Sequence, residues 1–409
     1  MSCLIRNCDV PGRGTLDVRL AHGVIERMAP HIVPAAAETV IDADGGALLP
    51  GLHDHHIHLA SLAASLDSVH CGPPQVNDAA GLATLLQRQA AGSGWLRGIG
   101  YHPIVAGDID RHWLDRHIPQ RPVRVQHRGG RLWILNSAAL RQLGLLDEAQ
   151  ASSLPAGIER RDGIPTGRLY ECDAWLAAQR GSSLPPLAAA SARLAACGIT
   201  GITDTTPHNG PAQWHHFQRE QRSGRLRQDM RMMGGSELGE LPSRPELRCA
   251  EYKIHLLESQ LPDIGCVVSS IQSARRQDRR VAIHCASRVE LVFALACLQQ
   301  SGTRPGDRIE HASVTPPELM PLIGEMGLRV VTQPHFVAER GDRYLAEVEP
   351  RDQPWLYRLR GFVDAGIALA AGSDAPFGSH DPWQAMAATT RRRTAAGAAI
   401  GAGEALTPE

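Results

Sequence analysis

The chain has 409 residues, which is long for one compact unit and enough for a large barrel with a small accessory domain, or for two domains. Its 42 basic and 43 acidic residues give a net charge of −1, so neither nucleic acid nor an anionic membrane is suggested as a partner. The first residues lack an apolar run long enough for a signal peptide, and no run of about 18 apolar residues follows. We therefore expect a soluble, cytoplasmic protein.

Short extended segments separated by turn residues predict a small β-domain at the start of the chain. Its strands are expected at residues 3–10, 16–21, 24–28 and 39–43. Glycine and proline follow the first segment, and His22-Gly23 precedes the third, so each break has turn chemistry. We expect this β-domain to occupy residues 1–50 and a second domain to occupy residues 51–409.

From residue 51 onward, apolar strand-like runs alternate with helical patterns, which is typical of a parallel α/β fold. The strand-like runs are 52–58, 199–204, 229–233, 251–257, 280–284, 308–311, 328–333 and 367–373. Helical patterns occupy 79–92, 183–197, 289–300 and 316–326. Thr315 and Pro316 are expected to start the last helix. About eight parallel strands fit a (β/α)₈ TIM barrel.

An insertion in this barrel is expected around residues 70–180. Residues 123–127 and 132–135 within it have the pattern of extended segments. Residues 155–171 are rich in glycine and proline, which predicts a loop or hairpin that belongs to an insertion over the barrel mouth.

The most informative stretch is 48–59, where an apolar run ends in Pro-Gly and a histidine-rich segment follows. If residues 52–58 form a strand, His56 and His58 lie on one face and Ile57 on the other. Two imidazoles placed in this way can hold one zinc, iron or nickel ion. Asp54 lies on the same face and could accept a hydrogen bond from a ligand histidine. The alternative is a solvated, histidine-rich turn.

Other potential ligands occur where the later strand-like runs stop. They are Lys253, His284, His311, Gln333, His335 and Asp374. In a TIM barrel the carboxyl ends of the strands meet at one face, and chemistry collects there. A single histidine at such a place is more often a buried core residue. Polar residues at five strand ends in series instead predict a metal site.

Lysine usage gives one further indication. Of the 42 basic residues, 41 are arginine, and Lys253 is the single lysine. This bias is typical of a GC-rich genome. A lysine retained despite this bias can be one whose amine has a role that arginine cannot fill. The alternative is that this lysine occurs by chance.

These motifs resemble those of the amidohydrolase superfamily, and more closely those of its YtcJ-like branch, also called amidohydrolase 3. The segments that carry the resemblance are 50–58, 94–98, 136–140, 198–200, 282–284, 308–312, 331–335 and 372–376. They span nearly the whole chain and imply a metal-dependent hydrolase on a distorted TIM barrel.

The resemblance also implies a role for each polar residue at the strand ends. Six residues would bind metal, namely His56, His58, Lys253, His284, His311 and Asp374. The first two histidines would hold the more buried ion, and the later two would hold a second ion. Lys253 would carry a carboxyl group that bridges the two ions. The implied cofactor is a divalent metal, with zinc favoured, at one or two ions per chain.

The implied mechanism uses metal-activated hydroxide, with Asp374 as the general base that then protonates the leaving nitrogen. His335 would polarise the carbonyl or stabilise the oxyanion, and a packing histidine is the alternative. We expect cleavage of a non-peptide C–N bond, most simply an N-acyl or N-formyl amide. The alternatives are a deaminase or cyclic-amide hydrolase on the same site, or a non-catalytic barrel with a binding role.

Two departures from the family pattern concern the substrate pocket. The acidic-Gly-Ser sequence usual after the strand-four lysine is absent after Lys253, and Gly130-Arg131 stands where Gly-His is common. Arg131 and Gln333 are therefore candidate substrate contacts. Arg131, with Arg128, would suit a carboxylate or phosphate on the substrate, and a solvated loop arginine is the alternative.

A third departure concerns the end of the chain. Residues 404–409 resemble the start of a helix that, in relatives, continues to strands completing the small β-domain. The fold is therefore expected to lack its C-terminal strands. Open strand edges in the β-domain would favour aggregation or pairing between copies, so a homo-oligomer is among the expected states.

Overall fold

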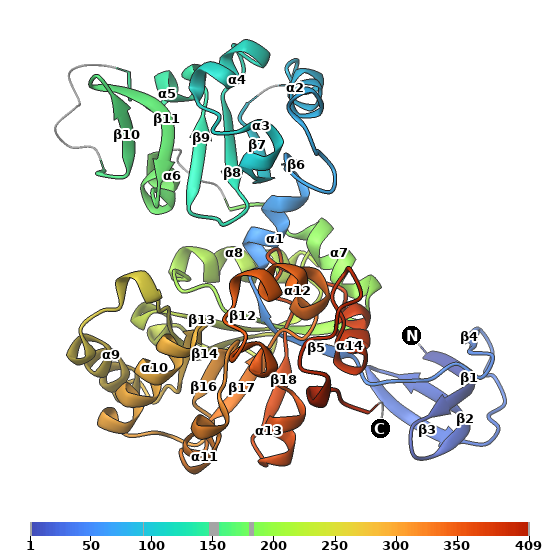
Figure 1. Cartoon of the computed structure of the whole chain (residues 1–409). Coiled ribbons are helices and arrows are strands. Elements are labelled where there is room, and N and C mark those ends of the chain that lie inside the picture. The colour runs from blue at the N-terminus through green and yellow to red at the C-terminus, as the bar shows by residue number, and fades with distance from the viewer. Residues whose placement is uncertain (1, 93, 147–154, 180–183, 408–409) are drawn as a thin grey trace. The chain divides into compact units, whose positions relative to one another are not determined.

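The computed structural model (Figure 1) describes residues 2–92, 94–146, 155–179 and 184–407. The chain divides into two compact units. One unit contains Met1–His53 and Gly198–Gly201, and the other contains Asp54–Cys197 and Ile202–Glu409. The domain boundary expected after residue 50 stays a prediction. Among the described residues, no helix combines the length and apolar character needed to cross a membrane.

The first unit contains a four-stranded sheet in the order β3-β2-β1-β4. Its strands are β1 (Ser2–Val10), β2 (Gly14–Ala21), β3 (Val24–Ala29) and β4 (Thr39–Asp42). The first three pair antiparallel in sequence order, and β4 pairs in parallel with β1. Gly14 and Gly23 have φ values of 76° and 79°, which glycine adopts without steric cost, so both tight turns can form. The four predicted strands are confirmed.

The barrel sheet has eight strands in the order β18-β17-β16-β15-β14-β13-β12-β5. Their bounds are β5 (Leu52–Ile57), β12 (Ile199–Asp204), β13 (Asp229–Gly234), β14 (Leu247–Ile254), β15 (Val281–Cys285), β16 (Arg308–His311), β17 (Arg329–Thr332) and β18 (Leu369–Ala371). From β13 to β18 each strand pairs in parallel with the next. The predicted eight-stranded α/β arrangement is confirmed.

Hydrogen bonds between the chain after β18 and strand β5 nearly close this barrel. The Asp374 amide donates to the His56 carbonyl oxygen over 2.7 Å, and the His58 amide donates to the Ala375 carbonyl oxygen over 2.9 Å. Closure therefore occurs at the carboxyl ends of the strands, where the sequence places its potential ligands.

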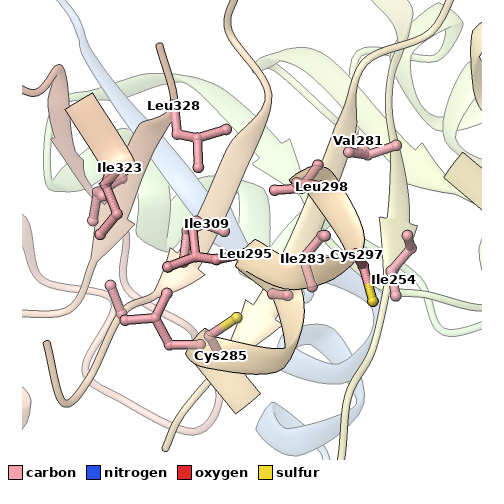
Figure 2. Packing of buried hydrophobic residues seen from close by; sticks show 14 of the residues in the cluster. Ile254, Val281, Ile283, Cys285, Leu295, Cys297, Leu298, Ile309, Ile323 and Leu328 are labelled. Atoms are coloured by element: carbon pink, nitrogen blue, oxygen red, sulfur yellow. The ribbon is translucent and has the colours of Figure 1, made fainter. Parts of the chain in front are cut away.

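A large apolar cluster packs the outer face of the barrel strands against the following helices (Figure 2). Ile283 and Cys285 of β15 are fully buried in it, as is Ile309 of β16. Because alternate residues of a strand point to opposite faces, His284 points away from this cluster, toward the barrel interior. Burial of each large aliphatic side chain contributes about 2 kcal/mol, so the cluster fixes which residues face the interior.

The helices of the barrel are α1 (Leu59–Leu66), α7 (Ala188–Ala196), α8 (Pro211–Arg222), α9 (Ile264–Arg276), α10 (Arg288–Ser301), α11 (Met320–Glu325), α12 (Phe336–Glu347), α13 (Arg360–Asp364) and α14 (Pro382–Arg391). Short 3₁₀ helices are η2 (Ser236–Glu240), η3 (Glu258–Gln260), η4 (Pro317–Leu319), η5 (Gln353–Trp355) and η6 (Ala402–Glu404).

Most predicted helices are present, with differences at their ends. The helix expected at 289–300 is α10. The helix expected at 183–197 is α7, and residue 183 lies outside the described residues. The segment 316–326 begins as η4 and continues as α11, and Thr315 does not cap it. The Thr315 hydroxyl instead donates to the Ala312 carbonyl oxygen over 3.0 Å, so the expected cap was wrong. The helix start expected at 404–409 lies partly outside the described residues, and Ala402–Glu404 is the 3₁₀ helix η6.

A six-stranded sheet in the order β10-β11-β9-β8-β7-β6 forms the insertion between α1 and α7. Its strands are β6 (Val69–His70), β7 (Leu96–Tyr101), β8 (Val123–His127), β9 (Leu132–Leu135), β10 (Ile158–Arg161) and β11 (Ile164–Tyr170). Its helices are α2 (Ala79–Arg88), α3 (Pro103–Ala106), α4 (Arg111–His117), α5 (Ser137–Gln142) and α6 (Asp173–Gln179). The predicted strands at 123–127 and 132–135 are confirmed, and residues 155–171 contain the expected hairpin.

Asn136 connects four parts of the insertion and is fully buried. Its Oδ1 accepts from the amides of Val123 and Ala139 over 3.0 and 2.9 Å. Its Nδ2 donates to the carbonyl oxygens of Ile118 and Arg121, both over 2.8 Å. Asn136 is also the N-cap residue of α5.

We expect Asn136→Ala to lower the free energy of unfolding by at least about 3 kcal/mol, because four buried backbone groups lose their partners. The measurement is urea unfolding followed by intrinsic fluorescence. Asn77→Ala is the matched control, since the exposed Asn77 donates one hydrogen bond, to the Pro74 carbonyl oxygen over 3.1 Å. A loss in Asn136→Ala no larger than in the control would contradict this account of the insertion.

Candidate metal centre

Strand β5 and the residue Asp374 after β18 bring three potential ligands together. The nitrogen or oxygen atoms that His56, His58 and Asp374 can offer all lie within 4.8 Å of one another. The Asp374 Oδ1 atom lies 3.4 Å from Nε2 of His56 and 3.2 Å from Nε2 of His58. His56 lies on β5 and His58 directly follows that strand, and both imidazoles approach Asp374, while Ile57 between them is fully buried.

Backbone geometry after β18 explains how Asp374 reaches this position. Asp374 has a φ of 53°, which is uncommon for a residue other than glycine and occurs often at functional sites. Gly372 lies so close to β5 that an added Cβ would come within 2.4 Å of the His56 Cβ. Asp54 ties the two segments, since its Oδ1 accepts from the amides of Ser373 and His56 over 2.9 and 3.1 Å.

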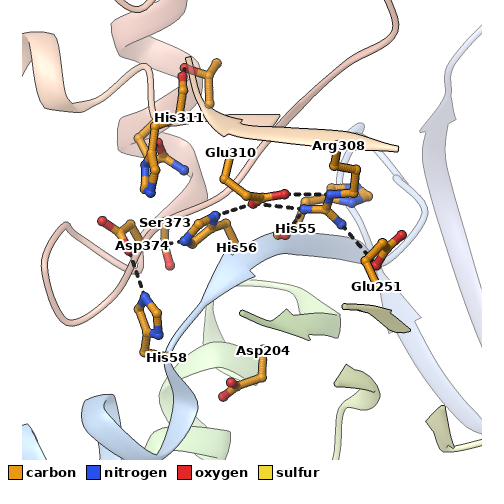
Figure 3. Close-up of polar contacts among 12 residues, drawn as sticks. His55, His56, His58, Asp204, Glu251, Arg308, Glu310, His311, Ser373 and Asp374 are labelled. Atoms are coloured by element: carbon orange, nitrogen blue, oxygen red, sulfur yellow. Dashed lines mark hydrogen bonds and ion pairs between the residues drawn. The ribbon is translucent and has the colours of Figure 1, made fainter. Parts of the chain in front are cut away.

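Glu310, and not Asp54, accepts the hydrogen bond from the ligand histidine His56. The Nδ1 atom of His56 lies 2.5 Å from Oε2 of Glu310, which is fully buried (Figure 3). The expectation for Asp54 was therefore wrong, because its carboxylate is engaged by backbone amides. With Nδ1–H donated to Glu310, the Nε2 atom of His56 is left to face a metal.

Arg308 supports Glu310 through two hydrogen bonds. Its Nε donates to Oε1 of Glu310 over 2.7 Å, and its second terminal nitrogen donates to Oε2 over 3.1 Å. Burial alone would raise the pKa of this carboxyl, but Arg308, Lys253 and His56 outweigh it and hold the pKa well below its usual range. Glu310 is therefore ionised at neutral pH and a strong acceptor.

Two more imidazoles are oriented in the same way. Nδ1 of His58 is hydrogen-bonded to the Thr206 hydroxyl over 2.9 Å, and Nδ1 of His311 to Oε1 of Gln333 over 2.7 Å. His311 has a φ of 68°, which departs from the strand geometry of the residues before it. Three candidate ligands therefore keep Nδ1 for the protein and Nε2 for a metal.

The second pair of predicted ligands lies next to the first. The imidazole centroid of His311 is 4.6 Å from that of His56 and 4.5 Å from that of His284. His255 stacks on His284 with centroids 4.5 Å apart. Burial lowers the pKa of His311 to about 3 and that of His284 well below its usual value. Both are therefore neutral imidazoles, the form that binds metal.

All six predicted ligands line one cavity of about 690 Å³, which also contains residues of the insertion. The ligand residues on its wall are His56, His58, Lys253, His284, His311 and Asp374. Lys253 is buried, and its Nζ has no hydrogen-bond partner among the described residues. A set of four imidazoles and a carboxylate beside an unsatisfied buried amine fits a divalent metal centre.

Burial and two hydrogen bonds shift the pKa of Asp374, the predicted general base, in opposite directions. Burial alone would raise the pKa of the Asp374 carboxyl, but hydrogen bonds with His56 and His58 hold it well below its usual range. Asp374 is therefore a carboxylate at neutral pH, which can bind a cation or accept a proton.

Three predicted site residues do not line this cavity. His335 is buried, and its Nε2–H donates to the Ser373 carbonyl oxygen over 3.0 Å. This contact fits the alternative of a packing histidine and gives no support to carbonyl polarisation. Gln333 orients His311 and is itself fully buried. Arg131 pairs with Glu171 and is half-exposed, so its role in substrate binding stays a prediction.

The sequence analysis missed the residues that support the ligands. Glu310 and Arg308 alternate with Ile309 on β16, and this spacing places both on the interior face. Charged residues on a buried face were therefore an available signal. Thr206 and Asp204 had no comparable signal. Asp204 accepts from the amides of Thr206 and Leu59 over 3.0 and 2.8 Å, and so ties the residue after His58 to the threonine that contacts the His58 ring.

A nearly closed parallel barrel with candidate histidine and aspartate ligands at the carboxyl ends of its strands fits one class of protein, the metal-dependent TIM-barrel hydrolases. Comparison with protein families agrees with this class. The amidohydrolase family model matches residues 39–409, so the chain belongs to the amidohydrolase family. The predicted family resemblance and the predicted enzyme class are confirmed.

The chain is similar to two named relatives and to two solved structures. N-substituted formamide deformylase of Arthrobacter pascens is 26% identical over 428 residues, covering 90% of this chain and 78% of the relative. The putative amidohydrolase YtcJ of Bacillus subtilis (strain 168) is 22% identical over 406 residues, covering 87% and 75%. An uncharacterised metal-dependent hydrolase of Pyrococcus horikoshii has a TM-score of 0.76 at 20% identity, covering 99% of this chain and 87% of that one. Its counterpart from Pyrococcus furiosus has a TM-score of 0.74 at 19% identity, covering 95% and 89%. Both structures support the fold.

We expect Glu310→Gln to weaken metal binding about 10- to 100-fold, because His56 loses the carboxylate that orients it and raises its basicity. The measurement is competition with a chromogenic chelator, with circular dichroism as the check on folding. Glu318→Gln is the matched control, since Glu318 is exposed on η4. Unchanged metal affinity in folded Glu310→Gln would show that this carboxylate does not support a metal ligand.

Proposed function

We propose that this chain hydrolyses the C–N bond of a small N-formyl or N-acyl amide. The observation that carries the proposal is the group formed by His56, His58 and Asp374, whose ligand atoms lie within 4.8 Å of one another on the wall of a cavity. The similarity to N-substituted formamide deformylase favours a formamide among non-peptide amides. The cavity of about 690 Å³ has the size expected for a small-molecule site.

In this proposal, Asp374 is the general base. As a carboxylate it accepts a proton from the water that attacks the carbonyl carbon, and it then delivers that proton to the leaving nitrogen. One C–O bond forms and the C–N bond breaks, which gives a carboxylic acid and an amine. A divalent metal supplies Lewis acidity when bound, which favours ionisation of water near neutral pH and polarises the carbonyl.

The ligand roles follow from the same geometry. His56 and His58 would hold one ion with Asp374, and His284 and His311 would hold a second. We favour zinc, because neutral imidazoles and a carboxylate form the donor set that zinc uses in hydrolases. These assignments draw support from the shared cavity and from the Nδ1 contacts of three of the four imidazoles.

Lys253 is proposed to bridge the two ions after carboxylation. Burial lowers the pKa of its amine, which favours the neutral form. A neutral amine can attack carbon dioxide, forming an N–C bond and releasing a proton, and the resulting carbamate offers two oxygen ligands. The unpartnered Nζ in the described structure supports this role, because an unsatisfied buried amine is otherwise costly.

We expect Asp374→Asn to lower kcat for N-formyl amines at least about 100-fold, because the amide cannot accept the proton from water. Metal content is measured on the same samples, so that loss of the base is separated from loss of a ligand. Asp364→Asn is the matched control, since the Asp364 side chain is 64% exposed and forms only a weak ion pair with Arg360.

The substrate panel for this experiment contains N-formyl amines, lactams and aminated heterocycles, each scored by the product released. Release of formate with loss in Asp374→Asn would support the proposal. Release of ammonia from heterocycles alone, or of amino acids from lactams alone, would replace it with the deaminase or cyclic-amide alternative. Turnover that is unchanged in metal-loaded Asp374→Asn would reject the assigned base.

We expect about two equivalents of metal per wild-type chain and about one or fewer in Lys253→Ala, because the bridging group is removed. Elemental analysis of protein purified without chelators gives the ratio. Addition of acetate or propionate to Lys253→Ala should restore part of the metal content, since a free carboxylate can occupy the bridging position. One equivalent in both proteins would instead indicate a mononuclear centre that does not use Lys253.

A further inference from the structure

The cavity that contains the candidate metal centre has a basic wall. Four arginines line it, namely Arg97, Arg128, Arg340 and Arg343. The acidic residues on the same wall are Glu339 and Asp374, and the second of these faces His56 and His58. The whole chain has a net charge of −1, so this excess of positive charge is local. A concave surface of one charge sign concentrates ligands of the opposite sign.

Two of these arginines are already engaged by other side chains. Arg343 pairs with Glu347 over 2.6 Å, and Arg97 donates to Gln126 over 3.3 Å. In the part of the chain that the structure describes, neither Arg128 nor Arg340 forms an ion pair with a carboxylate. A guanidinium that lines a cavity without a counter-charge can bind a carboxylate or phosphate through two parallel hydrogen bonds.

Arg340 is held in a fixed orientation close to the candidate metal centre. Its guanidinium lies over the Phe336 ring, 3.8 Å from the centroid, and one terminal nitrogen donates to the Phe377 carbonyl oxygen. The Phe377 amide in turn donates to the Asp374 carbonyl oxygen over 2.8 Å. The Phe377 ring packs edge-on against His58 with centroids 5.6 Å apart. Phe377 therefore connects Arg340 to the candidate ligands Asp374 and His58.

Arg128 reaches the cavity from the insertion. It follows β8 directly and lines the wall with its neighbours His127 and Gly129. Arg131 lies three residues further on, but Glu171 already neutralises it and it is not on the wall. Arg131 is therefore a matched control for Arg128, because only Arg128 is available to a ligand in the cavity.

We infer that the cavity selects amides that carry a carboxylate or phosphate group, which Arg128 and Arg340 bind while the amide lies at the metal centre. This inference rests on the proposed amide hydrolysis and adds a substrate class to it. The exposed face of Phe377, whose side chain is 47% exposed, gives an apolar surface between the two polar ends of such a substrate. Neutral formamides of the same size would bind without the contribution of the arginines.

The test is a binding measurement with two matched pairs of compounds. N-formylphenylalanine and N-formylphenethylamine differ by a carboxylate, and N-formylphosphoethanolamine and N-formylethanolamine differ by a phosphate. Calorimetric titration of the metal-loaded protein should give a Kd at least about tenfold lower for the anionic member of one pair. The pair that shows the larger difference identifies the anion.

Arginine variants locate the anion site. Arg128→Gln and Arg340→Gln should each weaken binding of the anionic compound at least about fivefold and leave the neutral compound within about twofold. Arg131→Gln should change neither. A preference that persists in both cavity variants and disappears when the metal is removed by chelation would overturn the inference, since the anion would then bind the metal directly. Equal affinity for both members of each pair would overturn it as well.

Turnover of the same compounds separates this inference from the proposed function. Arginine-dependent binding of the anionic compound without release of formate would support the anion site and reject the proposed hydrolysis. Release of formate from both members with equal kcat/KM would support the hydrolysis and reject the anion site.

Discussion

The contact between the chain after β18 and strand β5 is the constraint on which the site depends. The Asp374 amide bonds to the His56 carbonyl oxygen, so the hydrogen bond that closes the barrel also places two ligand residues side by side. Gly372 permits this approach, because any side chain there would collide with His56. Asp54 then fixes the register by accepting amides from both segments. The same contacts therefore close the barrel and assemble the site.

Inside this closed barrel, a buried charge network determines what the ligands can do. Arg308 and Glu310 are both nearly inaccessible to solvent, and a buried ion pair contributes little net stability because desolvation offsets the attraction. Its value lies in orientation. An ionised Glu310 accepts the Nδ1 proton of His56 and leaves Nε2 directed toward Asp374. Glu310 and His56 are held on barrel strands β16 and β5, so the imidazole cannot easily rotate into another arrangement.

The sequence predicted the strands and the placement of the candidate ligands at their carboxyl ends, because both follow from periodicity; their roles as metal ligands stay a prediction. Alternation along β5 and β15 assigns His56, His58 and His284 to the interior without knowledge of the fold. Contacts between segments far apart in the chain were beyond this reasoning. Glu310, 254 positions after His56, replaced Asp54 as its partner, and His335 points at a backbone carbonyl. His311 and Asp374 depend on left-handed backbone conformations that alternation does not predict. The sequence did not show which of Arg131 and Arg128 is available to a ligand, because the ion pair between Arg131 and Glu171 is seen only in the structure.

The cavity wall is formed by two kinds of segment, the barrel strands and segments outside them. The candidate ligands lie on barrel strands or shortly after them, and hydrogen bonds between the strands and the apolar cluster behind them fix the positions of these strands. The four arginines come from helix α12, from strand β7 of the insertion and from the chain that follows β8. Residues outside the barrel strands can change without disturbing the strands, because they carry no part of the barrel's hydrogen bonding. A chain of this construction can therefore keep one hydrolytic centre while the charge of its substrate changes. The proposed preference for an anionic substrate depends on Arg128 and Arg340, which line the cavity and form no ion pair with a carboxylate among the described residues.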